Sequence, residues 1–178
     1  DILDPNVRIG HMTRNPVADD MLEATQFTHV DFIVNTILNR DNQIAQLYVG
    51  DLVAAHEAAC TQAYTTFAQP FTEKAGLVIA ASPTTKNFVQ THKALFNAYQ
   101  AVKPQGRIIL LAPCPEGIGG DQFKKWLRLG DRASIIAGLR KQSEINGQTA
   151  LSTREKAPIT KLITEMSDDE VALIGAKK

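Results

Sequence analysis

The sequence is poor in cysteine and has no excess of charge of either sign. Its 178 residues include two cysteines, Cys60 and Cys114, which lie far apart and form no CxxC pair. This excludes a domain built on a disulfide framework, and we expect two small buried side chains in a protein of the reducing cytoplasm. Lysine plus arginine number 19, as do aspartate plus glutamate, so nucleic acid is not an expected partner.

Long apolar runs and metal-binding spacings are lacking as well. The longest apolar runs, such as residues 108–113, are far shorter than the ~20 residues of a membrane span, so no membrane is expected as a partner. Ser82 precedes a proline and has no GxSxG surroundings, which disfavours a serine hydrolase. No HxH, HxxxH or HExxH pattern joins the four histidines, so we expect no complete metal centre; they are His11, His29, His56 and His92.

What the sequence does contain is the composition of an ordinary folded domain. Hydrophobic residues make up 44% and charged residues 21% of the chain. A chain of this length buries roughly 70% of its unfolded surface and needs no disulfide or metal to hold a core. The first residue is Asp1 rather than methionine, so we expect an excised piece of a longer polypeptide.

The first 65 residues have the pattern of a helix, a hairpin and a second helix. Asn15-Pro16 is a cap and first turn for a helix that ends near Thr28. Residues 32–38 and 44–49 are rich in β-prone side chains and are separated by turn residues, which predicts a β-hairpin. Apolar residues at helical spacing then predict a helix over residues 51–64.

From residue 66 onward, strands and helices alternate, which predicts a parallel sheet with crossover helices. The expected fold class is α/β, with a small parallel-rich sheet flanked by helices, preceded by a helix and a β-hairpin from an adjacent domain. We divide the chain into a remnant of an amino-terminal domain (1–50), a connecting helix (51–65) and a carboxy-terminal α/β domain (66–178). The expected strands are 76–81, 107–112 and 159–164, and the expected helices are 87–102, 121–128, 134–142, 148–156 and a capped helix from Ser167.

The helix expected over residues 87–102 has two different faces. Phe88, Leu95, Tyr99 and Val102 form a stripe that we expect to be buried, with His92 packed inside it. The opposite face carries three polar side chains near the carboxyl end of a strand, where α/β sheets bind ligands. An ammonium and an amide one turn apart can hold a carboxylate, although an ordinary solvated helix face has the same pattern; the three residues are Gln90, Lys93 and Asn97.

The segment Pro113–Gly120 connects a predicted strand to the next helix. Its backbone amides could bind an anion, with a tight strand-to-helix turn as the alternative interpretation. It matches neither GxGxxG nor a P-loop, and Glu116 would repel a phosphate.

Several short motifs, in their order along the chain, resemble the nickel-pincer lactate racemase family. The resemblance covers nearly the whole chain. The motifs are Pro5–Gly10, Asn15-Pro16-Val17 with the acidic helix that follows, Asp31–Asn35, Gly50-Asp51 with Ala55-His56, Asn87–Leu95, and Gly117-Ile118-Gly119 before Phe123 and Trp126.

This resemblance implies an activity and a cofactor. Members of the family interconvert the enantiomers of 2-hydroxy acids: a nickel-pincer nucleotide takes hydride from the substrate carbon while a histidine takes the hydroxyl proton. The family holds this cofactor in its amino-terminal part, which we expect to be missing from this chain. The chain is therefore expected to be the substrate-side domain of such an enzyme, inactive alone, with the amino-terminal domain of the same polypeptide as its partner.

The resemblance also assigns roles to two residues. Gln90 and Lys93 match the glutamine and lysine with which the family orients and neutralises its substrate. The sequence departs from the family in having Val89 where tyrosine is common and Ser82-Pro83-Thr84-Thr85 where a Gly-Gly-Tyr-Pro stretch is common, which leaves the substrate open. Two alternatives remain: a relative without catalysis, and a non-catalytic α/β small-molecule or anion-binding module with its ligand at Gly117–Gly120.

Overall fold

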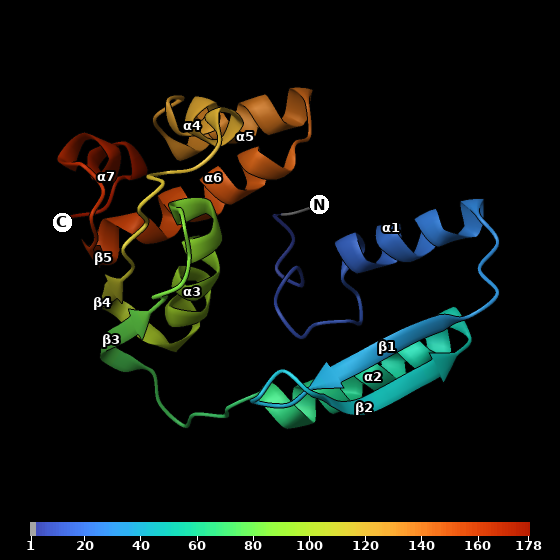
Figure 1. The fold of residues 1–178 in the computed structure, drawn as a ribbon. Coiled ribbons are helices and arrows are strands. Elements are labelled where there is room, and N and C mark those ends of the chain that lie inside the picture. The colour runs from blue at the N-terminus through green and yellow to red at the C-terminus, as the bar shows by residue number, and fades with distance from the viewer. Residues whose placement is uncertain (1–2) are drawn as a thin grey trace. The chain divides into compact units, whose positions relative to one another are not determined.

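The computed structural model describes residues 3–178, which form two compact units, one ending at Pro70 and the other beginning at Phe71. We refer to them as the amino-terminal unit and the carboxy-terminal unit (Figure 1). The chain is mixed α/β, as the sequence predicts. Among the described residues, no helix is both long and apolar enough to cross a membrane.

The amino-terminal unit is a β-hairpin with a helix packed against it. Strands β1 (Ile33–Leu38) and β2 (Ile44–Gly50) pair in antiparallel fashion, with Val34 opposite Val49. Helix α2 (Leu52–Phe67) contacts both strands. This helix, expected as a connector, thus lies inside the amino-terminal unit.

Side-chain caps and turns define the ends of these elements. The Asn39 side chain accepts hydrogen bonds from the amides of Asp41 and Gln43, which closes the hairpin turn. Asp51 caps α2, and Asn15 caps α1 (Pro16–Ala24) through the amides of Val17 and Ala18. A short 3₁₀ turn, η1 (Thr25–Phe27), follows α1.

The amino-terminal unit buries few side chains. Helix α1 has no buried residue, although Met21 and Leu22 are large and apolar. The buried side chains that the structure describes in this unit are Asn15, Ile37, Ala55 and Ala59. A two-stranded hairpin with so small a core is marginally stable by itself.

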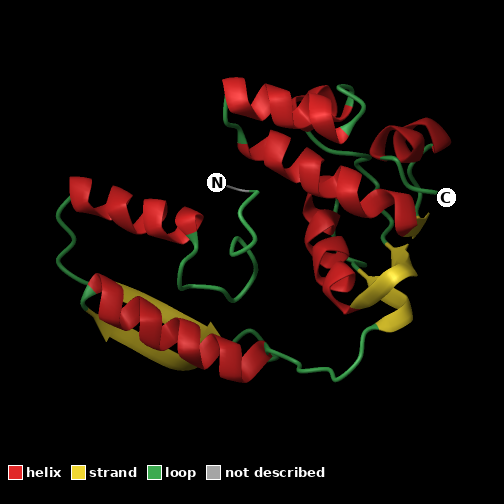
Figure 2. Ribbon diagram, turned by 180° about the vertical axis from the view of Figure 1, so that it is seen from behind, coloured by secondary structure: helices red, strands yellow, loops and turns green. Residues whose placement is uncertain are grey.

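The carboxy-terminal unit is built on a parallel sheet of three strands in the order β3-β4-β5. Figure 2 shows the strands of this unit in yellow beside its helices in red. Ile79 of β3 pairs with Ile109 of β4, and Ile109 pairs with Lys161 of β5. The elements are β3 (Ala75–Ala81), α3 (Phe88–Ala101), β4 (Val102–Leu111), α4 (Asp121–Leu127), α5 (Arg132–Lys141), α6 (Ile145–Lys156), η2 (Ala157–Ile159), β5 (Thr160–Ile163) and α7 (Asp168–Ile174).

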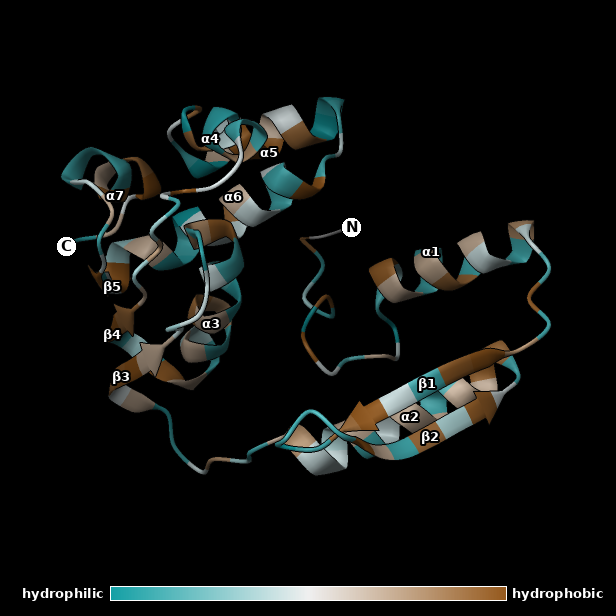
Figure 3. Cartoon of the chain, in the orientation of Figure 1, coloured by the Kyte–Doolittle hydropathy of each residue, from teal (hydrophilic) through white to brown (hydrophobic). Residues whose placement is uncertain are grey.

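The core of this unit lies between the sheet and its helices. Helix α3 contacts both β3 and β4, and it also contacts α6. Ile108, Leu110 and Leu162 point from the sheet into this core and are completely buried. Hydropathy colouring shows the apolar character of the strands (Figure 3).

Close packing of helices α4, α5 and α6 depends on glycine and on the single tryptophan. Trp126 of α4 donates its indole N–H to the carboxylate of Glu144. A Cβ at Gly138 would lie 2.7 Å from the Trp126 ring, and a Cβ at Gly147 would lie 2.8 Å from it. Both positions therefore require a residue without a side chain.

Candidate functional site

The amino terminus of α3 is held by the turn that follows β4. Asn87 caps the helix by accepting a hydrogen bond from the amide of Gln90 at 3.2 Å. The amides of Phe88 and Val89 donate to the carbonyl oxygens of Gly117 and Ile118. The amides of Phe88, Val89 and Gln90 thus have partners within the protein, so a ligand at this end of α3 must be bound by side chains.

Helix α3 has the two faces that its sequence predicts. Phe88, Thr91, Leu95 and Ala98 are buried, whereas the polar side chains predicted to share a face are all exposed; these are Gln90, Lys93 and Asn97. Lys93 and Gln90 lie one turn apart on the exposed face, as carboxylate binding would require. Their role in binding remains a prediction.

The prediction for Tyr99 is wrong. Tyr99 belongs to the expected buried stripe but is 36% exposed. Its ring lies 5.0 Å from the ammonium nitrogen of Lys156, so its face contacts a cation while the rest of the ring reaches solvent. The helical spacing of aromatic residues does not distinguish this position from a core position.

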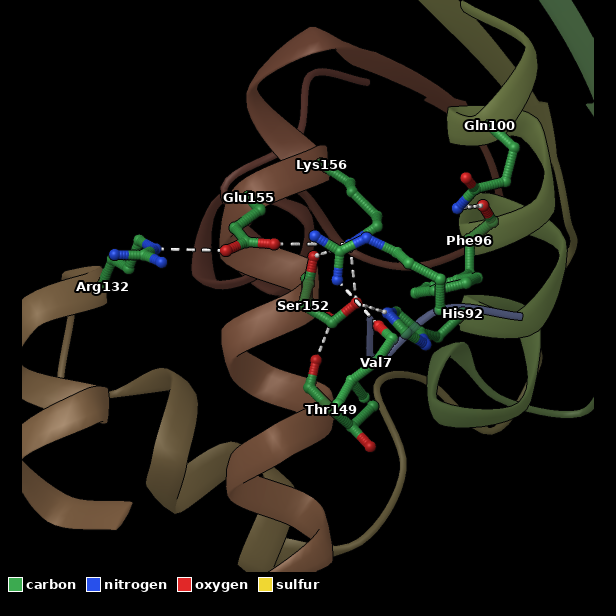
Figure 4. A network of polar contacts seen from close by, with 11 residues as sticks. Val7, His92, Phe96, Gln100, Arg132, Thr149, Ser152, Glu155 and Lys156 are labelled. Atoms are coloured by element: carbon green, nitrogen blue, oxygen red, sulfur yellow. Dashed lines mark hydrogen bonds and ion pairs between the residues drawn. The ribbon is translucent and has the colours of Figure 1, made fainter. Parts of the chain in front are cut away.

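His92 takes part in a polar network between α3 and α6 (Figure 4). Its Nε2 lies 3.0 Å from the hydroxyl of Ser152, and the Nζ of Lys156 donates to the same hydroxyl at 2.8 Å. Because Lys156 supplies a proton to the hydroxyl oxygen, we infer that Ser152 donates its own proton to Nε2 of a neutral His92. The sequence-based expectation of a packed imidazole is confirmed.

Electrostatics agree with a neutral imidazole. Burial, with the positive charge of Lys156 as the smaller cause, lowers the pKa of His92 to about 4. Lys156 is only 4% exposed, and its ammonium lies 4.8 Å from the centre of the Phe96 ring and 3.6 Å from the carboxylate of Glu155. Three kinds of partner therefore compensate for the burial of this charge: hydroxyl and carbonyl oxygens, aromatic faces and a carboxylate.

The turn for which anion binding is one of two interpretations contacts a carboxylate of the protein itself. Glu170 of α7 accepts a hydrogen bond from the amide of Ile118 at 3.4 Å, and it also caps its own helix through the amide of Ser167. The hydrogen bond from Ser167 is the main cause that lowers the pKa of Glu170. The amide of Gly117 donates to the carbonyl of Cys114. The observed contacts thus favour a structural turn over a binding site for an added anion.

A cluster of hydroxyl groups joins the loop between β3 and α3 to the first turn of α3. The Thr85 hydroxyl lies 2.6 Å from the hydroxyl of buried Thr91 and donates to Ser82. Thr91 in turn lies 3.3 Å from the sulfur of Cys114. Burial raises the pKa of the Cys114 thiol, so this residue is suited to packing and not to nucleophilic chemistry.

The described residues do not fit a metal centre. No group of three or more histidine, cysteine, aspartate or glutamate side chains among residues 3–178 is placed to hold a metal ion. Cys60 lies 3.4 Å from the Nε2 of His56 on α2, which provides at most two ligands.

Sequence analysis missed three polar residues that shape the site. Ser152 and Lys156 follow His92 in the sequence by 60 and 64 residues. Glu170 follows Ile118, whose amide it binds, by 52 residues. The local sequence contains a signal only for Ser152 and Lys156, because a serine and a lysine at i and i+4 share one helix face. The capping-box pattern places Glu170 on α7 but does not indicate the turn that it contacts.

Comparison with known proteins relates the chain to lactate racemases. It is 29% identical over 133 residues to the lactate racemase of Thermoanaerobacterium thermosaccharolyticum, a match that covers 71% of this chain and 30% of that protein. It is also 29% identical over 122 residues to the lactate racemase of Lactiplantibacillus plantarum, covering 67% of this chain and 28% of the relative. No family model matches the sequence. The chain thus spans about 30% of the length of these relatives.

Solved structures give the same relation at the level of the fold. The lactate racemase apoprotein from Thermoanaerobacterium thermosaccharolyticum matches 99% of this chain and 45% of its own, with a TM-score of 0.85 and 22% identity. A protein from Thermotoga maritima matches 92% of this chain and 47% of its own, with a TM-score of 0.67 and 16% identity. The resemblance seen in short motifs is therefore confirmed: the chain is similar to lactate racemases in sequence and in fold.

Proposed function

We propose that this chain, as a homologue of lactate racemases, is the substrate-side domain of an enzyme that interconverts the enantiomers of a 2-hydroxy acid. The observation that carries this proposal is the exposed face of α3, where Gln90 and Lys93 lie one turn apart in a chain similar to lactate racemases. The chain spans less than half of the structure it resembles. We therefore propose that it acts as part of a longer polypeptide, in the cytoplasm, and is inactive alone.

In this proposal, Gln90 and Lys93 have complementary tasks. The ammonium of Lys93 neutralises the substrate carboxylate as a point charge, and the amide of Gln90 donates a hydrogen bond that fixes its orientation. A carboxylate held at two points presents its neighbouring carbon in one position, which favours reaction at that carbon. The network of His92, Ser152 and Lys156 supports these side chains by joining α3 to α6.

The resemblance implies a nickel-pincer nucleotide, which would accept the substrate hydride. The described residues of this chain do not form a set of ligands for nickel. We therefore assign the cofactor, and the groups that transfer the proton, to the amino-terminal domain of the same polypeptide. The part proposed for this chain is limited to binding and orienting the 2-hydroxy acid.

Replacing Lys93 by alanine tests this proposal in the longer polypeptide, made in a host that synthesises the cofactor. We expect kcat/KM for racemisation of 2-hydroxy acids to fall about 10- to 100-fold, because the charged partner of the carboxylate is lost. Gln90→Ala should lower it about tenfold, since it removes a neutral donor. Lys141→Ala is the matched control, because Lys141 is an exposed lysine at the end of α5.

Intact mass and nickel content give a second, independent measurement. A covalent mass increase with about one nickel per chain supports a racemase-like enzyme. Unchanged turnover of Lys93→Ala on every accepted 2-hydroxy acid would show that the site assignment is wrong. An unmodified, nickel-free polypeptide from a host that loads a control racemase would instead favour a relative without catalysis, for which the departure at Val89 is the sequence signal.

A further inference from the structure

The sheet of the carboxy-terminal unit leaves one of its two faces uncovered. Leu77 and Ile79 on β3 are 52% and 66% exposed, Leu111 on β4 is 40% exposed and Ile163 on β5 is 48% exposed. The pairing of the strands places these side chains and Ile109 on the same face. We call these five residues the outer face.

An exposed face of this kind is unusual for a parallel sheet. Parallel sheets occur almost only with both faces covered, because their strands are apolar on both sides. The opposite side of these strands follows the rule, since Ile108, Leu110 and Leu162 are fully buried. The outer face thus has the character of an interaction surface, and no element in the described part of the chain covers it.

The charges around the outer face define the chemistry of that partner. Arg107 pairs with Leu77, and Lys161 pairs with Ile109, so two cations lie directly beside the apolar residues of this face. The three strands contain no aspartate or glutamate. Two copies of the outer face would bring like charges together, which disfavours self-association. An apolar surface with acidic flanks is the complementary partner.

The topology of the sheet limits which crossover could place a helix on the outer face. The strands advance in one direction from β3 to β4 to β5, and Lys177 continues this order through a parallel bridge to Lys161. Right-handed crossovers that advance in one direction place their helices on one side of the sheet. A helix on the outer face therefore belongs to a crossover in the opposite direction, which leads to a strand beside β3. Within the described residues, β3 pairs with β4 alone.

We propose that the outer face binds an amphipathic helix with acidic flanks from the remainder of the same polypeptide, and that a strand next to this helix pairs with β3. This rests on the proposed function, in which the chain is part of a longer protein. The lactate racemase structure that it resembles is more than twice as long, since this chain covers 45% of it. The related proteins thus contain enough additional chain for such a crossover.

The added strand has a consequence for the candidate site. Ligands of open α/β sheets bind outside the carboxyl ends of the strands where the strand order reverses. A strand on the free side of β3 places this reversal at the carboxyl end of β3. Helix α3 begins just after this end, and Gln90 and Lys93 lie in its first two turns. The proposed crossover thus completes the wall of the site that α3 begins.

Thiol labelling of a cysteine on the outer face tests the proposal. Ile79→Cys is made in a Cys60→Ser background, because Cys60 is partly accessible while Cys114 is buried. Ile145→Cys is the matched control, since Ile145 on α6 is an isoleucine that is 75% exposed outside the outer face. Rates of maleimide labelling are compared between the 178-residue chain and the longer polypeptide, after circular dichroism confirms that each variant is folded.

We expect Ile79→Cys to react at least about tenfold more slowly in the longer polypeptide, with the Ile145→Cys rate unchanged. Adding Lys161→Glu should restore part of the rate, because it opposes the acidic flanks. Equal rates for Ile79→Cys in both polypeptides overturn the proposal. Slow labelling already in the 178-residue chain also overturns it, and its dependence on concentration identifies a second copy as the occupant.

Failure of the proposed function is distinguishable from failure of this inference. Racemase activity and nickel content are measured on the same preparation of the longer polypeptide. Protection of Ile79→Cys without activity supports the docked helix and counts against the proposed function. Activity without protection supports the proposed function and overturns the docked helix.

Discussion

The amino-terminal and carboxy-terminal units differ in how completely each one buries its own elements. In the carboxy-terminal unit, α3 packs against the sheet, and buried residues occur in every helix from α3 to α7. In the amino-terminal unit, α1 buries none of its residues, and the hairpin has a single buried large side chain, Ile37. The comparison teaches that side-chain caps and a closed turn can define helices and strands where few buried side chains support them.

The largest expected effect contrasts one buried isoleucine from each unit. Ile108→Ala removes a fully buried side chain of the carboxy-terminal unit and should lower the free energy of unfolding by about 4 kcal/mol. Ile37→Ala should shift the same transition by less than about 0.5 kcal/mol, because Ile37 lies in the other unit. The measurement is urea unfolding followed by the fluorescence of Trp126, the single tryptophan. An equal shift by both variants would contradict two separately folding units.

A smaller effect concerns the buried polar network, which belongs to the carboxy-terminal unit. His92 has a pKa of about 4 when folded against 6.5 for an ordinary histidine, so the unfolded chain binds more protons between these values. Stability should therefore fall as the pH drops from about 6.5 to about 4, by about 3 kcal/mol in total.

The matched variant for this prediction is His92→Gln, which cannot titrate. The free energy of unfolding of wild type and variant is measured from pH 7 to pH 4, again through Trp126. The difference between their pH profiles is the contribution of His92. Parallel profiles would mean that the imidazole is not the buried neutral base of the network, and a histidine NMR titration would then locate its pKa directly.

The smallest effect compares the helix caps of the two units. Asn15→Ala and Ser167→Ala each remove a side-chain cap, at about 1 kcal/mol. Ser167→Ala should shift the Trp126 transition, because Val171 and Ile174 anchor α7 in the core. Asn15→Ala should leave that transition in place and accelerate amide exchange in α1 only. A stability loss seen by Trp126 in both variants would contradict this difference.

Local signals explain how much of this fold could be predicted from the sequence. The residues expected as caps at Asn15 and Ser167 are caps in the structure, and the expected strands and helices all occur, because capping and periodicity depend on neighbouring residues. The start of β4 differs: it begins at Val102, five residues before the expected strand, because Val102 pairs with Ala75 across an irregular register. Such pairing is not visible in the local sequence.

The candidate site was predictable only in part, for a similar physical reason. The exposed position of Lys93 follows from helical periodicity, whereas the neutral state of His92 follows from its burial in the packed unit and, as the smaller cause, from the charge of Lys156 on another helix. Glu170, whose carboxylate accepts a hydrogen bond from the amide of Ile118, lies on the last helix, α7. Contacts across such distances depend on the whole packed unit, and a single sequence does not specify them.

The free side of β3 also has a meaning for how the 178-residue chain behaves in a test tube. Residues Ala75–Ala81 contain no charged side chain and no proline, and they are mostly apolar. An edge strand of this composition is a template for cross-β stacking, in which identical segments from many molecules pair edge to edge. We therefore expect fibril formation at high concentration to start at β3, with one lysine introduced at Leu77 sufficient to delay it.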